Sequence, residues 1–257
     1  MGEVYLAQDT PGRFLICANL SGRTSREVTG MSIAERISLP LVSGERLSRE
    51  EFLRRWEALP NLKMAELLEG VVYLPSPLGI AHGSEDFLVA YWLAHYAGFT
   101  PGCQGGSNAT WLMLEDAPQP DCFLRIQPEY GGQSGVERGL GKGAPELAVE
   151  VSQSSASYDL GPKLRLYRAA GVQEYITVLL AESKVIWRRL VAGAYNTIEP
   201  DSDGLLRSIV FPGLWLDPDA LLSQDTPRIL EILNRGLQSS EHYEFVQALA
   251  QRRTARP

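Results

Sequence analysis

Apolar and polar residues follow helical or strand spacing through most of the chain after residue 45. The first helix signal is a capping box, in which Ser48 is the N-cap and Glu51 lies three residues later. Phe52 and Trp56 follow at helical spacing, and Pro60 cannot continue a helix. The pattern therefore predicts a helix that begins after Ser48 and ends before Pro60.

A second and longer stripe of apolar residues predicts a helix over 80–97, with Gly98 as a suitable C-terminal stop. One face of this helix is formed by Ile80, Ser84, Phe87, Leu88, Tyr91 and Ala94.

Strand signals are most frequent in the middle of the chain. Residues 64–74 predict two short strands with Gly70 in the turn between them. The glycine-rich stretch 131–143 predicts a long loop, of the kind that is often functional in compact domains. Further strands are expected at 110–115, 121–126, 146–151, 175–180 and 184–190.

A helix over 159–170, closed by Gly171, separates the strand at 146–151 from the strand at 175–180. A strand, a crossover helix and another strand favour neighbouring, parallel strands. Thr226 and Pro227 begin a further helix with an N-cap and a first-turn proline, and 240–252 predicts another.

The composition is that of an ordinary globular protein, with 257 residues, 44% of them hydrophobic, and a net charge of −7. No apolar run approaches the roughly 18 residues that span a bilayer. Acidic residues precede the first apolar run, so we expect no signal peptide, a cytoplasmic location and no membrane partner. Three cysteines without a CxxC pair argue against a disulfide framework or a structural zinc site.

The net negative charge also limits how this protein can bind nucleic acid. Proteins that coat nucleic acid without specificity usually carry net positive charge. Any nucleic-acid contact here must come from a local basic patch, with divalent cations offsetting nearby carboxylates.

Two carboxylates stand out as candidates for chemistry. Asp121 lies at the entry of an apolar strand, and Glu150 lies inside a strand that otherwise favours full burial. A buried carboxylate is costly unless it is paired or binds a cation. Asp159, Lys163 and Tyr167 lie four residues apart and would share one helix face. Two carboxylates on adjacent strands can hold Mg²⁺, and a lysine can orient or deprotonate an attacking water.

Structural roles remain open for each of these residues. Glu150 could be a buried acid paired with an arginine, and Asp121 could cap the entry of its strand. Asp159 and Lys163 could form an exposed i,i+4 pair worth only ~0.2–0.5 kcal/mol. His82 is more naturally a polar residue at a helix N-terminus or a substrate contact than a metal ligand.

A larger set of motifs occurs along the chain in a fixed order. The motifs are 66–70 (ELLEG), 75–77 (PSP) with His82, 120–121 (PD), 145–152 (PELAVEVS), Asp159 with Lys163 and Tyr167, 170–175 (AGVQEY) and 211–214 (FPGL). Over roughly 46–222 this set resembles the Uma-two family, a restriction-endonuclease-like group of nucleases. The resemblance implies a mixed α/β core with a mixed central sheet flanked by helices, as in PD-(D/E)XK nucleases.

The resemblance also implies a metal site. Asp121 and Glu150 would be the metal carboxylates, with Glu66 and the Val151 backbone carbonyl as further ligands for Mg²⁺ or Mn²⁺. The pattern usually has lysine two residues after the glutamate, but this sequence has Ser152 there. The lysine would then be displaced onto the next helix, at Lys163, as the third catalytic residue.

Two functions follow from these expectations. The first is a metal-dependent endonuclease that hydrolyses DNA phosphodiester bonds, acting as a homodimer because two strands need two sites. The second is a nuclease-fold DNA-binding or assembly module without activity, which the acidic charge and Ser152 favour. The predicted organisation is a poorly organised extension over 1–45, a nuclease domain over 46–225 and a C-terminal helical extension over 226–257.

Overall fold

The computed structural model describes residues 7–9, 13–15, 39–75, 77, 79–153 and 155–254. The chain divides into two units, 1–38 and 39–257. In the first, β1 (Ala7–Asp9) pairs antiparallel with β2 (Arg13–Leu15). The predicted extension over 1–45 falls largely outside the described residues, and the domain boundaries stay a prediction.

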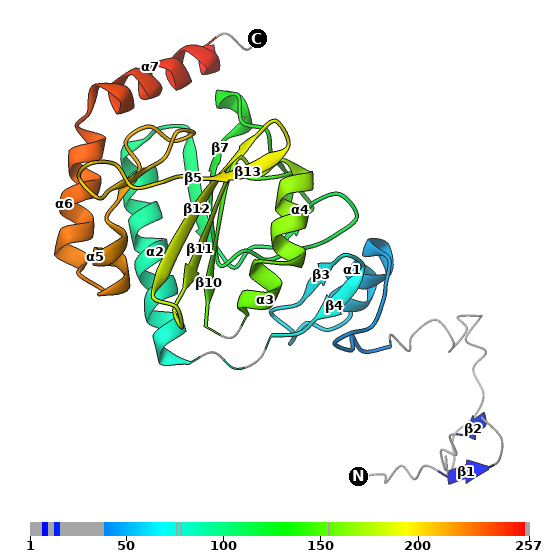
Figure 1. Ribbon diagram of the computed structural model, residues 1–257. Coiled ribbons are helices and arrows are strands. Elements are labelled where there is room, and N and C mark those ends of the chain that lie inside the picture. Colours follow the sequence, from blue (N-terminus) through cyan, green and yellow to red (C-terminus); the bar gives the residue numbers. More distant parts are fainter. Residues whose placement is uncertain are drawn as a thin grey trace, which may run out of the picture. The chain divides into compact units, whose positions relative to one another are not determined.

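A six-stranded sheet forms the centre of the second unit, in the order β13-β12-β11-β10-β7-β5 (Figure 1). β10 and β11 are parallel, and the other neighbours are antiparallel, so the predicted mixed sheet is confirmed. The strands are β5 (Cys103–Ser107), β7 (Cys122–Ile126), β10 (Leu147–Ser152), β11 (Glu174–Leu179), β12 (Lys184–Val191) and β13 (Ala194–Thr197).

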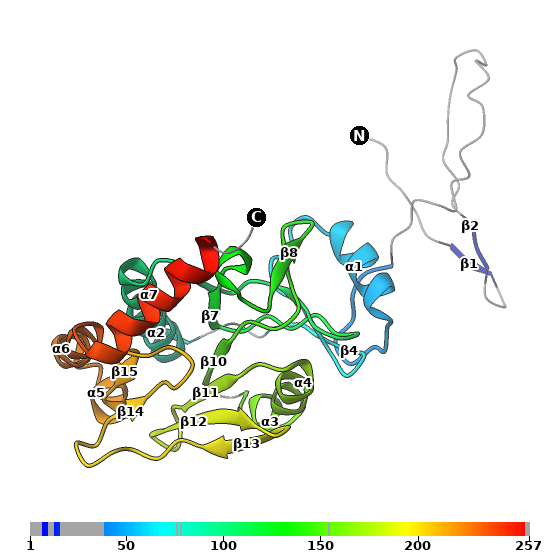
Figure 2. The ribbon, with the colours of Figure 1, turned by 90° about the horizontal axis from the view of Figure 1, so that it is seen from above.

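Helices cover both faces of this sheet. α2 (Ile80–Phe99) and α4 (Pro162–Ala170) lie on opposite sides of β10 and β11 (Figure 2). Alternate residues of a strand point to opposite faces. Val149 and Val151 accordingly join the cluster that contains α2, whereas Ala148 packs with Tyr167 of α4. Glu150 shares the parity of Ala148 and therefore points to the α4 side.

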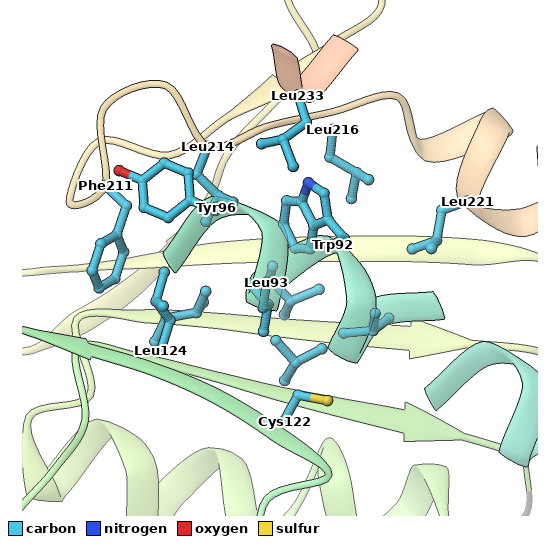
Figure 3. Packing of buried hydrophobic residues seen from close by; sticks show 14 of the residues in the cluster. Trp92, Leu93, Tyr96, Cys122, Leu124, Phe211, Leu214, Leu216, Leu221 and Leu233 are labelled. Carbon is cyan, nitrogen blue, oxygen red and sulfur yellow. The ribbon is translucent and has the colours of Figure 1, made fainter. Parts of the chain in front are cut away.

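The buried face of α2 is rich in aromatic residues. Trp92 and Tyr96 pack beside Leu93 against the sheet strand that carries Cys122 and Leu124 (Figure 3). The opposite face of the helix, which carries most of the apolar stripe read from the sequence, is exposed. The predicted helix is confirmed, but Gly98 does not end it, because the helix continues to Phe99.

The helix expected over 159–170 is two helices, α3 (Ala156–Asp159) and α4. Gly161 adopts φ −115° and ψ −103°, which are not helical, and Pro162 follows at the first position of α4. Asp159 therefore does not share a helix with Lys163. The expectation of one helix is wrong because Gly161 and Pro162 favour a break that apolar spacing alone does not reveal.

A small lobe beside the sheet contains α1 (Arg49–Glu57) and the hairpin of β3 (Glu66–Leu68) and β4 (Val71–Tyr73). The predicted capping is confirmed, because Ser48 accepts a hydrogen bond from the Glu51 backbone at 3.3 Å. The predicted hairpin is confirmed too. Glu69 and Gly70 both have positive φ, as a two-residue hairpin turn of the primed type requires.

The structure differs from the sequence pattern at several strands. Residues 110–115 contain only β6 (Trp111–Leu112), because Leu114 turns the chain with φ 51°. β6 joins β8 (Gly135–Glu137) and β9 (Leu140–Lys142), so the expected loop over 131–143 carries a hairpin. The strands β5 and β13 were not predicted from the sequence pattern. A short 3-10 helix, η2 (Pro128–Tyr130), follows β7.

The C-terminal segments return to the face that α2 covers. Ile229, Leu233 and Leu249 are part of the same core as Trp92. No helix within the described ranges is long and apolar enough to cross a membrane. The elements are β14 (Leu206–Arg207), β15 (Trp215–Leu216), α5 (Pro218–Leu222), α6 (Thr226–Leu237) and α7 (Ser240–Thr254).

Candidate active site

A pocket of about 360 Å³ opens between the small lobe and the edge of the central sheet. Its wall includes the carboxylates of Glu66, Asp121, Glu150 and Asp159, together with the ammonium of Lys163. Residues from four separate segments of the chain therefore meet at one place. Among the described residues that line the pocket, Lys163 is the only lysine or arginine.

Glu150 is held on both of its oxygens. The Tyr167 hydroxyl donates to Oε1 at 2.6 Å, and Lys163 Nζ donates to Oε2 at 2.9 Å. Only 1% of Glu150 and 5% of Lys163 is exposed, so this ion pair is buried. Each carboxylate oxygen has two lone pairs, which leaves Glu150 able to accept one further contact per oxygen.

Glu66 joins the same lysine from the small lobe. Its Oε1 lies 3.0 Å from Lys163 Nζ and also accepts the backbone N–H of Gln119 at 2.7 Å. The Gln119 carbonyl lies 3.5 Å from Lys163 Nζ, and the Gln119 side chain accepts the Ala65 backbone at 3.2 Å. Gln119 thus ties the first strand of the small lobe to the segment that leads into Asp121.

Asp121 lies one residue before β7 and is bound to the neighbouring strand. Its Oδ2 accepts the backbone N–H of Val151 at 2.7 Å. The carbonyl of Ser152 accepts from Leu180 on the β11 side. Because successive residues of a strand direct their backbone groups to opposite edges, the Val151 carbonyl faces the β7 side, as does its N–H.

Ser152 occupies the position on β10 where the nuclease pattern has its lysine, and the lysine of this pocket comes from α4 instead. Its hydroxyl donates to Asp159 Oδ2 at 2.6 Å, and Ser155 donates to the same oxygen at 2.6 Å. The other Asp159 oxygen lies 3.9 Å from Lys163 Nζ. A lysine at position 152 would lie on the face of β10 that Asp159 and α4 occupy. Lys163 instead reaches the same carboxylates from the first turn of α4.

Burial and the crowding of carboxylates shift the protonation equilibria. Burial raises the pKa of the Asp121 carboxyl to about 6, partly countered by the Lys163 charge and the Val151 N–H. Burial also raises the pKa of Glu150 well above its ordinary value. Burial by itself would lower the pKa of Lys163. The four carboxylates, Glu150 foremost, outweigh burial and raise that pKa well above the ordinary value, so Lys163 is an ammonium at neutral pH.

The geometry bears on the purely structural roles that the sequence left open for these residues. Glu150 is paired with a lysine rather than an arginine. Asp159 and Lys163 are both buried, so the exposed i,i+4 pair is wrong. His82 is buried in the first turn of α2 and lines the same pocket as Asp121. The catalytic and ligand roles of all these residues stay predictions.

The oxygen atoms of the pocket are of the kind that a hard divalent cation binds. Carboxylate and backbone carbonyl oxygens are the ligands that Mg²⁺ and Mn²⁺ take. Four carboxylates also face one ammonium, which leaves an excess of negative charge that a divalent cation would offset. In the part of the chain that the structure describes, no three histidine, cysteine, aspartate or glutamate side chains form a ready metal cluster. Lys163 Nζ lies between Glu66 and Glu150 instead.

Sequence reasoning missed three residues of this pocket. Gln119 lies between two prolines in the segment that leads to Asp121. These prolines are the sequence feature that could have drawn attention to it. Tyr73 and Tyr158 line the pocket and pack edge to face, with ring centroids 4.9 Å apart. They come from β4 and α3, and nothing in their sequence spacing indicates that the two rings meet.

Comparisons with known proteins identify the family of this chain. No curated protein matches the chain. A solved structure from Anabaena variabilis, described as a putative nuclease belonging to DUF820, is 18% identical, with a TM-score of 0.49, over 68% of this chain and 99% of that chain. Residues 49–219 match the family model Uma2, described as "Putative restriction endonuclease". That match spans more than half of the sequence, and the chain therefore belongs to the Uma2 family.

Proposed function

We propose that this protein is a metal-dependent endonuclease that hydrolyses DNA phosphodiester bonds at the pocket around Lys163. The observation that carries the proposal is the convergence of Glu66, Asp121, Glu150 and Lys163 from separate elements in one pocket. Buried charges of this kind weaken a fold unless they are fully paired. Their collection beside an open pocket is therefore better explained by function than by stability.

Asp121, Glu150, Glu66 and the Val151 carbonyl are the residues proposed to hold Mg²⁺ or Mn²⁺. Nucleases with this fold generally use divalent metals. The bound ion would lower the pKa of the attacking water and offset charge on the phosphate. Tyr167 and Val151 orient the Glu150 and Asp121 carboxylates through the hydrogen bonds described above.

Lys163 acts as a charged donor in this proposal. A pKa well above the ordinary value keeps its proton in place at neutral pH, which argues against a role as general base. Its ammonium can instead orient the attacking water and stabilise negative charge that develops on the phosphate oxygens. The sequence left both roles open, and the surrounding carboxylates favour orientation.

The direct test is a cleavage assay on supercoiled, linear and single-stranded DNA with Mg²⁺, Mn²⁺ or EDTA. We expect cleavage with either metal, none in EDTA, and loss of at least a hundredfold in rate for Glu150→Gln. Glu182→Gln, at an exposed position between β11 and β12, is the matched control and should cleave normally. Equal rates for the wild type and Glu150→Gln would contradict the proposed site.

A nuclease-fold module without catalysis is the second candidate. The observation that favours it is the contact of Lys163 with Glu66 and Glu150, which partly satisfies these charges without a metal. In such a module the ammonium would be a permanent structural counterion, and DNA or protein binding would be the remaining function.

The two candidates differ in their response to metal. A ligand that binds only the folded state raises the melting temperature. We expect millimolar Mn²⁺ to raise the melting temperature of the wild type relative to EDTA, and to have little effect on Asp121→Asn. Identical melting curves for the wild type with Mn²⁺ and with EDTA would favour the module without catalysis.

A further inference from the structure

The outward face of α2 is unusually apolar for a surface helix. Ile80 is 89% exposed, Phe87 75% and Tyr91 40%. Single exposed apolar residues are common, but a contiguous group on one element marks an interaction site. This group lies on the helix whose other face builds the core of the second unit.

The exposed residues follow a heptad pattern. A seam runs along the helix with spacings of four and three residues in alternation, which is the signature of a helix that packs against another helix. The seam residues are Ile80, Ser84, Phe87, Tyr91, Ala94 and Gly98. A side chain added at Gly98, or at Gly83 beside the seam, would meet no atom within 4 Å, so both positions are open on the surface.

No charge interrupts the seam. The two acidic residues of α2 lie elsewhere: Glu85 is buried, and Asp86, which is partly buried, accepts the Cys122 thiol at 3.3 Å. The chain as a whole carries a net charge of −7, so two copies repel each other over most orientations. An uncharged face is where two copies can meet without opposing like charges.

The seam is complementary to itself when two copies run antiparallel. A twofold axis midway between Phe87 and Tyr91 places these two aromatic residues opposite each other across the pair. The same axis places Ile80 opposite Gly98 and Ser84 opposite Ala94. Every one of the six seam residues thereby meets another seam residue, and the largest aliphatic side chain meets the residue with none.

The area suits a weak dimer that forms as the concentration rises. Large side chains of this kind bury on the order of 150–250 Å² when they are fully covered. Covering the exposed parts of Ile80, Phe87 and Tyr91 would remove on the order of 400 Å² per copy. The total of about 800 Å², with the small seam residues in addition, lies below the ~1,200 Å² of standard interfaces and in the range of weak, transient ones.

We propose that α2 is the dimerisation surface of this protein, packing antiparallel on α2 of a second copy through the seam from Ile80 to Gly98. Gly79 and His82, at the N-terminal end of α2, line the pocket described above. An antiparallel pair therefore places the two pockets at opposite ends, on the order of 30 Å apart along the helix axis at 1.5 Å per residue. The dimer is expected whether or not the pocket cleaves DNA.

The first test is the mass of the full chain in solution, by analytical ultracentrifugation across a concentration series. We expect the wild type to approach twice its 28.3 kDa mass as the concentration rises, and Phe87→Glu to stay at the monomer mass or to show a dissociation constant raised at least tenfold. Val136→Glu, an equally conspicuous exposed apolar position on β8, is the control and should remain dimeric. Circular dichroism melts confirm that each exposed substitution leaves the fold intact.

The second test fixes the orientation. Antiparallel packing brings Ser84 level with Ala94 of the second copy, while the two Ser84 residues lie about 15 Å apart along the axis. Ser84→Cys with Ala94→Cys should therefore form a disulfide-linked dimer on mild oxidation, and Ser84→Cys alone should not, relative to the unmodified chain. Crosslinking by the single variant would overturn the antiparallel arrangement. A wild type that stays monomeric across the concentration series would overturn the proposal.

Discussion

Replacement of Lys163 by methionine is expected to remove at least 99% of the DNA cleavage rate and to destabilise the metal-free protein by about 3–5 kcal/mol. The second figure is the usual cost of removing one partner of a buried ion pair. Methionine has a similar length but no charge. Glu150, Glu66 and Asp159 would then face one another in the pocket wall without the ammonium that now lies 2.9, 3.0 and 3.9 Å from their oxygens.

A divalent cation should recover part of this loss. If the carboxylates form a metal site, Mn²⁺ can replace the missing positive charge, so the melting temperature of Lys163→Met should rise more on adding Mn²⁺ than that of the wild type. Cleavage should stay low at temperatures where circular dichroism shows the variant to be folded. The substitution is expected to affect the fold as well as the chemistry, because Lys163 lies in the interior.

Lys184→Met is the matched control, since Lys184 is exposed on β12 and is expected to affect neither measurement. Cleavage by Lys163→Met at the wild-type rate would show that Lys163 takes no part in the chemistry. A normal melting temperature in EDTA would show instead that the carboxylates do not depend on its charge.

The second large effect concerns Glu174, which is fully buried at the start of β11. Its Oε1 accepts the backbone N–H groups of Ile209 and Val210 at 2.8 and 3.1 Å. Its Oε2 accepts from Ser208 at 2.7 Å and from the Trp187 indole at 3.1 Å. This carboxylate therefore connects β11 and β12 to the segment that precedes β15.

Glu174→Ala should lower the free energy of unfolding by about 4–5 kcal/mol, because two buried and two partly buried donors lose their acceptor, and an unsatisfied buried donor costs ~1–3 kcal/mol. Glu174→Gln should cost less, since the amide oxygen still accepts from two of the donors. Urea unfolding measures both, with the exposed Glu182→Ala as control. A loss below 1 kcal/mol for Glu174→Ala would mean that the four contacts are not formed in solution.

The core of the sheet could be predicted from the sequence because burial on both faces leaves a simple signal. The strands β7, β10, β11 and β12 are continuous or nearly continuous apolar runs, and the helical segment between β10 and β11 indicates their parallel pairing. Asp121 and Glu150 were conspicuous for the same reason. A carboxylate within or beside such a run is costly, so its presence alone suggested a partner or a cation.

Other features depended on contacts that no local pattern records. β5 contains two adjacent glycines, and β13 is largely exposed, so both strands exist because a neighbouring strand supplies their hydrogen bonds. The stripe on α2 was visible in the sequence, but periodicity does not reveal which side of a helix meets the sheet. That side is the one with Trp92 and Tyr96, whose rings fill the core.

The sequence by itself singled out the charged residues of the pocket and predicted the parallel pairing of β10, which carries Glu150, with β11. Only the tertiary structure decided that Lys163 would be shared among Glu150, Glu66 and Asp159. The break at Gly161 and Pro162 sets the direction in which α4 begins, and Gln119 ties Glu66 of the small lobe to the segment before Asp121. Charged groups interact according to their distance in space. The distances between separate elements are set by packing and not by spacing along the chain.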